Sequence, residues 1–285
     1  MTELRAFAER VLLQPDLGEK LRPNRTPFTD AAPGEPLVAE APVRSPELKP
    51  DADGGADRMP KRAALRDPAA RGVAHHLMAN HELQALEIMA ATLLKHPDAP
   101  PSFRLGMATI MLDEQRHTRM HAARAARHGC PFGSRPVSAL IWRRSRQFDG
   151  LLDYCAGLPL VFEGANLDHT IAFAEAFESF GDPKSAHVMR QIHDDEIEHV
   201  QFGIDWLRRL KPDGMTDWDA FVEHLVDPLE PRNARGGVFQ EQARRDAGLD
   251  DDFVNRIRDA VGSATSKAAS QPRARHAAPL SRESA

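Results

Sequence analysis

The sequence predicts an all-α protein whose main part is a four-helix bundle with one long crossover connection. Four long segments of helical periodicity, bounded by proline and glycine, fill residues 67–212. Valine, isoleucine and threonine are sparse outside short clusters, and no segment alternates convincingly like a half-buried strand. The connections between the four segments are short, long and short. Short connections join antiparallel neighbours, so we expect two helical hairpins joined by a crossover.

Composition narrows the class of protein. The chain has 285 residues, of which 41% are hydrophobic and 28% charged, as is usual for a soluble globular protein. Its net charge of -5 argues against a general nucleic-acid or anionic-membrane binder. Cys130 and Cys155 are its two cysteines, which fits a reducing compartment. The sequence shows neither a membrane-spanning apolar run nor a signal-peptide pattern, so we expect a cytoplasmic protein.

Residues 1–66 are predicted to form a short helix followed by an extended segment. Apolar side chains repeat along one helical face of residues 2–13: Leu4, Phe7, Val11 and Leu12. Residues 14–66 are rich in proline, aspartate and glycine and show little periodicity. Such a segment is either disordered or wrapped around the main domain, and its scattered hydrophobic residues make partial docking plausible.

Proline and glycine set the limits of the first predicted hairpin. Asp67 can cap the first helix, with Pro68 at its first position, and Pro97 stops it. The second helix is expected to begin near Pro100 and to end before Gly129, a natural residue for the left-handed position after a helix.

The second hairpin is predicted to follow a connection that contains a short helix at 138–146. Its first helix covers about 149–180, and Pro159 should either kink that helix or mark its true start. Its second helix runs from Pro183 to the residues before Pro212. Residues 213–262 are expected to be a helical extension with a last helix near 250–261, and residues 263–285 a disordered tail.

A five-residue motif occurs twice, as DEQRH at 113–117 and DEIEH at 195–199. In a helix, the Glu at the second position and the His at the fifth position of each motif lie one turn apart on one face, where both can bind the same metal ion. A further Glu stands 32 residues before the first of these Glu residues and 33 before the second. Two Glu and two Glu-x-x-His from four helices are the ligand set of ferritin-like di-metal proteins. The predicted metal ligands are Glu82, Glu114, His117, Glu163, Glu196 and His199.

The charge of these acids favours a metal site over a metal-free core. Each of the four glutamates lies within an apolar helical stripe, and burying four unpaired carboxylates would cost many kcal/mol. Two divalent cations balance four carboxylates. Carboxylate and imidazole ligands with open positions suit iron or manganese better than structural zinc. The expected cofactor is two Fe ions, with Mn or a mixed Mn/Fe pair as alternatives.

Other polar residues are candidates for supporting roles. Asp113 and Asp195 each precede a ligand Glu, and we assign each to the ligand histidine of the opposite hairpin, because such histidines usually donate their other N–H to a carboxylate. Asn166 lies one turn from Glu163 and could either bond to a ligand or substrate or be a satisfied core residue.

Some assignments stay open between two readings. Glu87 is a rival of Glu82, five residues on and about 140° around the helix, although the matching spacing favours Glu82. His81, His121 and His193 could line the site or be surface or supporting residues. Tyr154 lies about half a turn out of phase with Glu163, which argues against a radical-storage role.

Several stretches resemble bacterial ferritin-like proteins grouped as a domain of unknown function. They include HHLMANHELQALEIMAATLLKHPDAPPSFR, LDEQRH, FEGANLDHTIAFAEAFESFGD and HDDEIEHVQFGIDWL, together with ERVLLQPDLGEKL and ARGGVFQEQARRDAGLDDDF. The resemblance covers most of the chain apart from about the last 20 residues. It implies a ferritin-like di-metal bundle with ligands at the six positions above. More distantly, the chain is similar to the tRNA methylthio-isopentenyl-adenosine hydroxylase.

We therefore expect a di-iron oxidase or oxygenase that uses O2 to hydroxylate, desaturate or N-oxidise a small organic substrate. The sequence does not identify its electron donor, and we expect a monomer or homodimer. The alternatives are an iron-handling or peroxide-detoxifying protein, a tRNA-modifying hydroxylase and a metal-free helical scaffold. Nucleic acid is not the expected partner, because the basic clusters at 143–146 and 208–211 are small.

Overall fold

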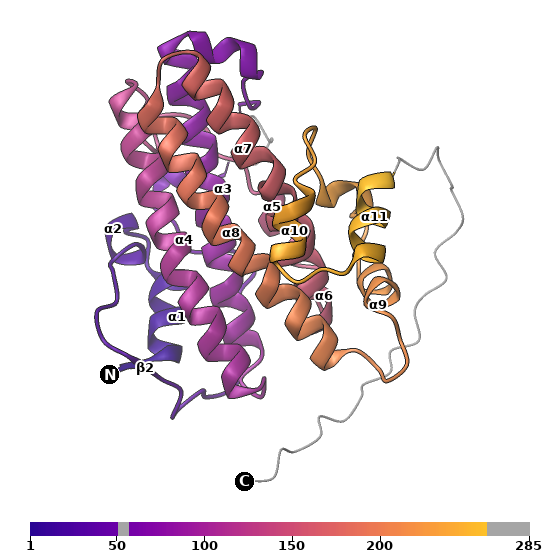
Figure 1. The fold of residues 1–285 in the computed structure, drawn as a ribbon. Coiled ribbons are helices and arrows are strands. Elements are labelled where there is room, and N and C mark those ends of the chain that lie inside the picture. The colour runs from indigo at the N-terminus through magenta and orange to yellow at the C-terminus, as the bar shows by residue number, and fades with distance from the viewer. Residues whose placement is uncertain (51–56, 261–285) are drawn as a thin grey trace.

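Four long helices form the centre of the computed structural model, which describes residues 1–50 and 57–260. They are α3 (Pro68–Lys95), α4 (Pro101–Arg127), α7 (Gly164–Ser179) and α8 (Pro183–Leu210). Pairs α3–α4 and α7–α8 are antiparallel hairpins, and α4 and α7 run in the same direction (Figure 1). A parallel second and third helix requires the long crossover at 128–150, so the predicted all-α bundle is confirmed.

The helix limits follow the local signals in the sequence. The Asp67 side chain accepts a hydrogen bond of 3.0 Å from the backbone N–H of Ala69 and so caps α3. Gly129 and Gly181, which follow α4 and α7, have φ of 75° and 78°, a region that favours glycine. The crossover carries α5 (Leu140–Ser145), within the range expected for a short helix.

The third long helix is not continuous. It consists of α6 (Leu151–Gly157), a π-helical turn η3 (Leu158–Glu163) and α7. Pro159 lies in the π-helical turn, where its missing N–H and its ring disturb the regular helical bonding. A Cβ added to Gly203 of α8 would lie 2.4 Å from Cβ of Pro159, so only glycine permits this close contact. The irregular turn ends at Glu163, one of the predicted ligands.

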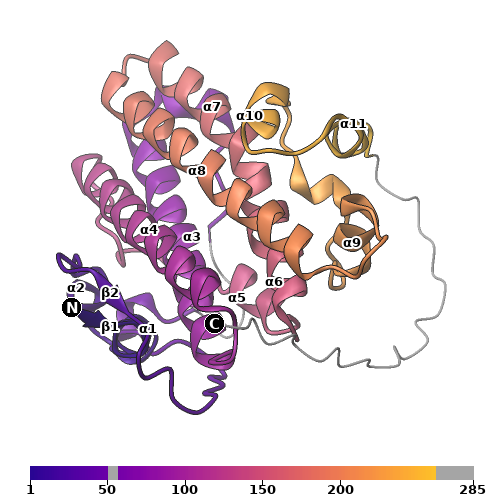
Figure 2. The ribbon, with the colours of Figure 1, turned by 60° about the horizontal axis from the view of Figure 1, so that its bottom comes forward.

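The N-terminal segment lies along the first hairpin (Figure 2). It contains β1 (Thr2–Glu3), α1 (Leu4–Leu13), α2 (Leu17–Lys20), β2 (Phe28–Thr29), η1 (Pro46–Leu48) and η2 (Arg62–Arg66). β1 and β2 form a short parallel pair in which Thr2 faces Phe28. The four apolar residues predicted to share a face of α1 are fully buried. Further along, the backbone N–H of Leu37 donates to Leu94 of α3 over 2.8 Å. Residues 1–50 thus wrap the bundle, one of the two expected arrangements.

The C-terminal extension packs on the other side, against α6, α7 and α8 (Figure 2). It contains α9 (Asp217–Glu223), η4 (Pro231–Ala234), α10 (Glu241–Asp246) and α11 (Asp251–Asp259). Its anchor is Arg244, whose buried guanidinium bonds to Asp168 of α7 over 2.8 and 3.0 Å. The predicted disordered tail at 263–285 lies outside the described residues.

The apolar core is divided into two clusters along the bundle. On α3, Met78 belongs to the smaller cluster and Leu86 to the larger one, with Glu82 between them. On α8, Met189 and Val200 stand in the same relation to Glu196. The predicted ligands therefore occupy a polar layer between two apolar regions. In the described part of the chain, no helix is both long and apolar enough to cross a membrane.

Candidate metal centre

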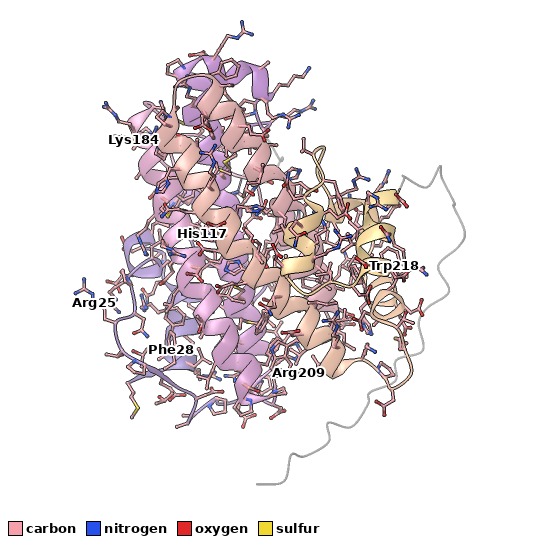
Figure 3. The ribbon with its side chains drawn as sticks, viewed as in Figure 1. Arg25, Phe28, His117, Lys184, Arg209 and Trp218 are labelled. Atoms are coloured by element: carbon pink, nitrogen blue, oxygen red, sulfur yellow. The ribbon has the colours of Figure 1, made fainter. Side chains whose placement is uncertain are left out.

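The six predicted ligands converge at one level of the bundle. Glu82 comes from α3, Glu163 from the end of η3, and the two Glu-x-x-His pairs from α4 and α8. Glu82 is 5% exposed, Glu163 is 3% exposed, and the other four are fully buried. Figure 3 labels His117 near the middle of the bundle, whereas Lys184 and Arg209 lie towards its ends. Helix packing therefore brings together residues that are far apart in the sequence.

These side chains form two groups that share Glu114. Possible ligand atoms of Glu82, Glu114, His117 and Glu196 all lie within 4.8 Å of one another, and the same limit holds for Glu114, Glu163 and His199. Glu114 Oε2 lies 3.8 Å from Nδ1 of His117, while its Oε1 lies 3.3 Å from Nδ1 of His199. A carboxylate with one oxygen towards each imidazole can bridge two neighbouring positions.

Most of the inward-facing polar atoms in this cluster lack a hydrogen-bond partner among the described residues. The buried atoms without a partner include both carboxylate oxygens of Glu114 and Glu163, Oε2 of Glu196, and Nδ1 of His117 and His199. Each unsatisfied buried polar group costs about 1–3 kcal/mol, and a charged group costs more. Carboxylate oxygens and imidazole nitrogens are the donors that divalent iron or manganese accepts. The cluster therefore fits a bound metal ion far better than a metal-free core.

Several pKa values in the cluster are raised, because the buried carboxylates have too few positive charges near them. Burial, together with the negative charges of Glu196 and Glu82, raises the pKa of Glu163 to about 8. Burial and the charge of Glu82 raise the pKa of Glu114 well above its usual value. Desolvation opposes the charging of His199, but its contacts with Asp113, Glu114 and Glu196 raise its pKa well above the ordinary value. The metal-free cluster therefore takes up protons, which a cation would displace.

A pH dependence of stability follows for the metal-free protein. The folded state holds protons on Glu163, Glu114 and His199 that the unfolded chain releases, so the stability they provide declines as pH rises towards the folded pKa of about 8. Urea denaturation in the presence of EDTA should give a lower free energy of unfolding at pH 8 than at pH 6.5. Glu163→Gln should make this difference smaller. The assignment of these raised pKa values would be contradicted if the free energy of unfolding rose between pH 6.5 and pH 8. It would also be contradicted if Glu163→Gln showed the same pH dependence as the native protein.

Two aspartates hold the outer side of the histidines. Asp195 Oδ2 lies 2.9 Å from Nε2 of His117, and Asp113 Oδ2 lies 3.7 Å from Nε2 of His199. The structure thus brings each aspartate to the histidine of the opposite hairpin. Arg116 donates to both aspartates, over 2.7 and 2.6 Å. Nε2 of His117 is hydrogen-bonded to Asp195, whereas Nε2 of His199 has only the more distant Asp113 beside it. In both imidazoles, Nδ1 faces the carboxylates.

Asn166 is joined to the cluster directly. Its Nδ2 donates to Oε1 of Glu196 over 3.0 Å. Of the two expectations for this residue, the structure therefore supports the bond to a ligand. The contact orients one oxygen of Glu196 and leaves Oε2 facing Nδ1 of His199 at 3.4 Å.

Glu87, the rival of Glu82, is engaged elsewhere. Its carboxylate accepts hydrogen bonds from Lys20 over 2.9 Å and from Arg44 over 2.6 to 3.1 Å. All three residues are at most 3% exposed. Arg44 also donates to Asn80 over 2.9 Å. Glu87 therefore fastens the N-terminal segment to the bundle, and Glu82 is the α3 residue in the cluster.

The other candidate histidines have different surroundings. His121 Nε2 lies 3.6 Å from Oε1 of Glu82, and its Nδ1 lies 2.9 Å from Nδ1 of the buried His75. His193 Nδ1 is 3.1 Å from the hydroxyl of Thr170, and His193 lies outside both groups of ligand atoms. Sequence reasoning overlooked His75, although it lies seven residues before Glu82 and hence on the same helical face.

The lone tyrosine and the cysteines are separate from the ligand groups. Tyr154 is buried, and its hydroxyl has no hydrogen-bond partner among the described residues. Burial and the nearby charge of Glu163 raise the pKa of Tyr154 well above the usual value. Cys130 and Cys155 are buried and free. Burial raises the pKa of Cys155, which makes its thiol unreactive at neutral pH.

A cavity of about 370 Å³ lies beside the cluster. Glu82, Glu114 and Glu163 line its inner end, and the rest of its wall comes from α3, α5, η3, α7 and the 228–233 loop. The C-terminal extension therefore contributes to the cavity wall through this loop. The N-terminal segment does not, because no described residue before His81 lines the cavity. This segment instead packs against α3 through α1 and against α4 through β2.

Comparisons with known proteins identify a family but no activity. The family model described as a protein of unknown function (DUF455) matches residues 9–255. Neither the curated proteins nor the solved structures contain a match to this chain.

Proposed function

The chain belongs to the DUF455 family, whose function is unknown, and we propose that it is a di-iron oxidoreductase of the oxidase or oxygenase type acting on a small organic substrate. The observation that carries this proposal is the carboxylate of Glu114, which is buried, unpartnered and directed with one oxygen towards each ligand histidine. Such a bridging carboxylate is the central ligand of ferritin-like di-metal sites.

Charge supports two ions rather than one. Glu82, Glu114, Glu163 and Glu196 carry four negative charges when ionised, and two divalent cations neutralise them. Glu82, His117 and Glu196 would hold one ion and Glu163 with His199 the other, and Glu114 belongs to both groups. We assign iron, with manganese or a mixed pair as alternatives, because this donor set suits both metals.

Iron bound here would supply the activation of O2. Insertion of one oxygen atom from O2 into a substrate bond leaves the other atom as water and consumes two electrons and two protons from an external donor. The protein's own residues orient the ligands through Asp113, Asp195 and Asn166. Apolar layers lie on both sides of the cluster along the bundle, so the cavity is the route by which small molecules reach it.

The cavity favours an organic substrate over plain iron handling. It connects the ligand carboxylates with a largely apolar wall, which iron storage would not need. Its volume of about 370 Å³ suits a single small molecule, so we place the tRNA-modifying alternative second. We further propose that the protein works in the cytoplasm as a monomer or homodimer.

The test is anaerobic loading with Fe(II), followed by exposure to O2. We expect about two iron ions per chain, and O2 consumption that depends on the bound iron. Iron content by mass spectrometry of the metal and O2 uptake with an electrode are the readouts. Lack of iron binding would overturn the proposal. A native mass of a many-subunit cage, with O2 uptake unaffected by organic additives, would favour iron handling instead.

A further inference from the structure

We infer that the cavity binds a substrate with an apolar body and one anionic end group, a carboxylate or phosphate, which Arg144 holds. This inference rests on the proposed function for the role of the ligand as substrate, but the binding itself requires only the cavity. Arg144 lies in α5, on the crossover, and lines the same cavity as the ligand carboxylates.

The body of the cavity is apolar. Side chains from four separate elements and from the 228–233 loop make up this part of the wall: Ala85, Ile141, Leu158, Phe162, Ala165 and Leu229. Leu158 is 1% exposed, while Leu140, which also lines the cavity, is 49% exposed. The cavity therefore runs from a buried end at the carboxylates to an open end at the surface. A ligand that fills it must place apolar atoms along most of its length.

Arg144 is a half-buried guanidinium without a carboxylate partner among the described residues. Four other arginines are buried among the described residues. Arg71 donates to the backbone carbonyls of Leu65 and Phe180, and the other three pair closely with a carboxylate. Arg44 pairs with Glu87 over 2.6 Å, Arg104 with Asp30 over 2.7 Å and Arg244 with Asp168 over 2.8 Å. A partly desolvated guanidinium gains most from a carboxylate or phosphate, to which it can form two parallel hydrogen bonds. The free position beside Arg144 is therefore suited to an anion.

The other basic groups of the cavity do not supply a lasting positive charge. His81 and His169 line it, and both are exposed. Exposed imidazoles are mostly neutral at pH 7.5, whereas arginine remains charged. Asn166 and Asn233 add uncharged polar groups. Arg144 is thus the one full positive charge that the described residues place on this wall.

The arrangement also orients the ligand. The carboxylates that would hold metal are at the buried end, and Arg144 belongs to the partly exposed α5. With its anionic group at Arg144, a ligand extends its apolar body towards the cluster. A cationic ligand would meet the guanidinium and be repelled. The cavity is therefore selective for charge as well as for size.

The test compares three probes of equal chain length: hexanoate, hexanol and hexylamine. Isothermal titration into the metal-loaded full-length protein at pH 7.5 should show hexanoate binding about tenfold or more tightly than hexanol, since hydrogen bonds to a charged group are stronger than those between neutral groups. Hexylamine should bind more weakly than hexanol. Equal affinity for hexanoate and hexanol would overturn the inference.

Variants distinguish Arg144 from the metal as the anion's partner. Arg144→Gln should bring hexanoate affinity down to that of hexanol and leave hexanol binding unchanged, and Arg144→Lys should restore part of the difference. Arg143→Gln is the matched control, because Arg143 is an exposed neighbour in α5 that does not line the cavity. If Arg144→Gln had no effect and removal of metal abolished hexanoate binding, the inference would fail.

The two proposals fail separately. If the protein takes up no iron but still binds hexanoate in a way that depends on Arg144, the proposed function is contradicted and the anion site is supported. Normal iron loading and O2 uptake without a preference for hexanoate would do the reverse. Circular dichroism of each variant confirms that it is folded.

Discussion

Replacing Glu114 by glutamine is expected to remove nearly all bound metal from the protein. Glu114 belongs to both groups of ligand atoms, and its two oxygens face different histidines. An amide has one oxygen and no charge, so it cannot bridge two cations. Loss of this bridge weakens both positions, whereas Glu163→Gln removes a ligand from the group around His199 alone. Metal analysis after loading with Fe(II) and desalting should give about two ions for the native protein, about one for Glu163→Gln and close to none for Glu114→Gln.

A control within the second motif makes the comparison sharp. Glu198→Gln makes the same chemical change two residues from Glu196, but Glu198 is exposed. It should retain the metal content of the native protein, while Glu196→Gln should lose most of it. Retention of metal by Glu114→Gln and Glu196→Gln would show that these carboxylates are not ligands and would remove the basis of the proposed function.

Glu87→Ala is expected to destabilise the protein by about 3–5 kcal/mol, because it leaves two buried cations without their shared anion. Lys20 and Arg44 are 1% and 3% exposed, so water cannot replace the lost carboxylate without structural change. The loss should loosen the N-terminal wrap from α3. Chemical denaturation measured by circular dichroism gives the change in the free energy of unfolding.

The same variant separates the two candidate acids of α3. Glu87→Ala should still bind metal under conditions in which it is folded, whereas Glu82→Ala should lose metal. Glu198→Ala, an exposed site in the same bundle, should change stability by less than about 0.5 kcal/mol. Glu87→Ala with native stability, or with a selective loss of metal, would contradict the role assigned to Glu87.

The long helices were predictable because their end signals are local. Asp67, Pro68 and Gly129 act within one turn of the chain, through a cap, a fixed φ and a left-handed residue. The break in the third helix was anticipated as a kink or a helix start at Pro159. Its form as a π-helical turn depends on the close packing of Pro159 on Gly203 of α8, a contact between distant parts of the chain.

The duplicated Glu-x-x-His motif is visible in the sequence because helical spacing alone places its residues on one face. The spacing favoured Glu82 over Glu87 as the ligand, yet both are buried acids on the same helix. Only the buried cations of the N-terminal wrap assign Glu87 to a different task. His75 and Arg144 were not singled out, because their importance comes from neighbours supplied by other elements.

By itself, the sequence determined the all-α class, the helix limits and the residue types of the candidate metal centre, because periodicity, capping and one-turn spacing are properties of a single segment. The tertiary structure alone decided that Glu87 pairs with Lys20 and Arg44 of the N-terminal segment, and where a cavity opens beside the carboxylates. Those features arise from contacts between segments far apart in the chain, whose packing no local pattern records.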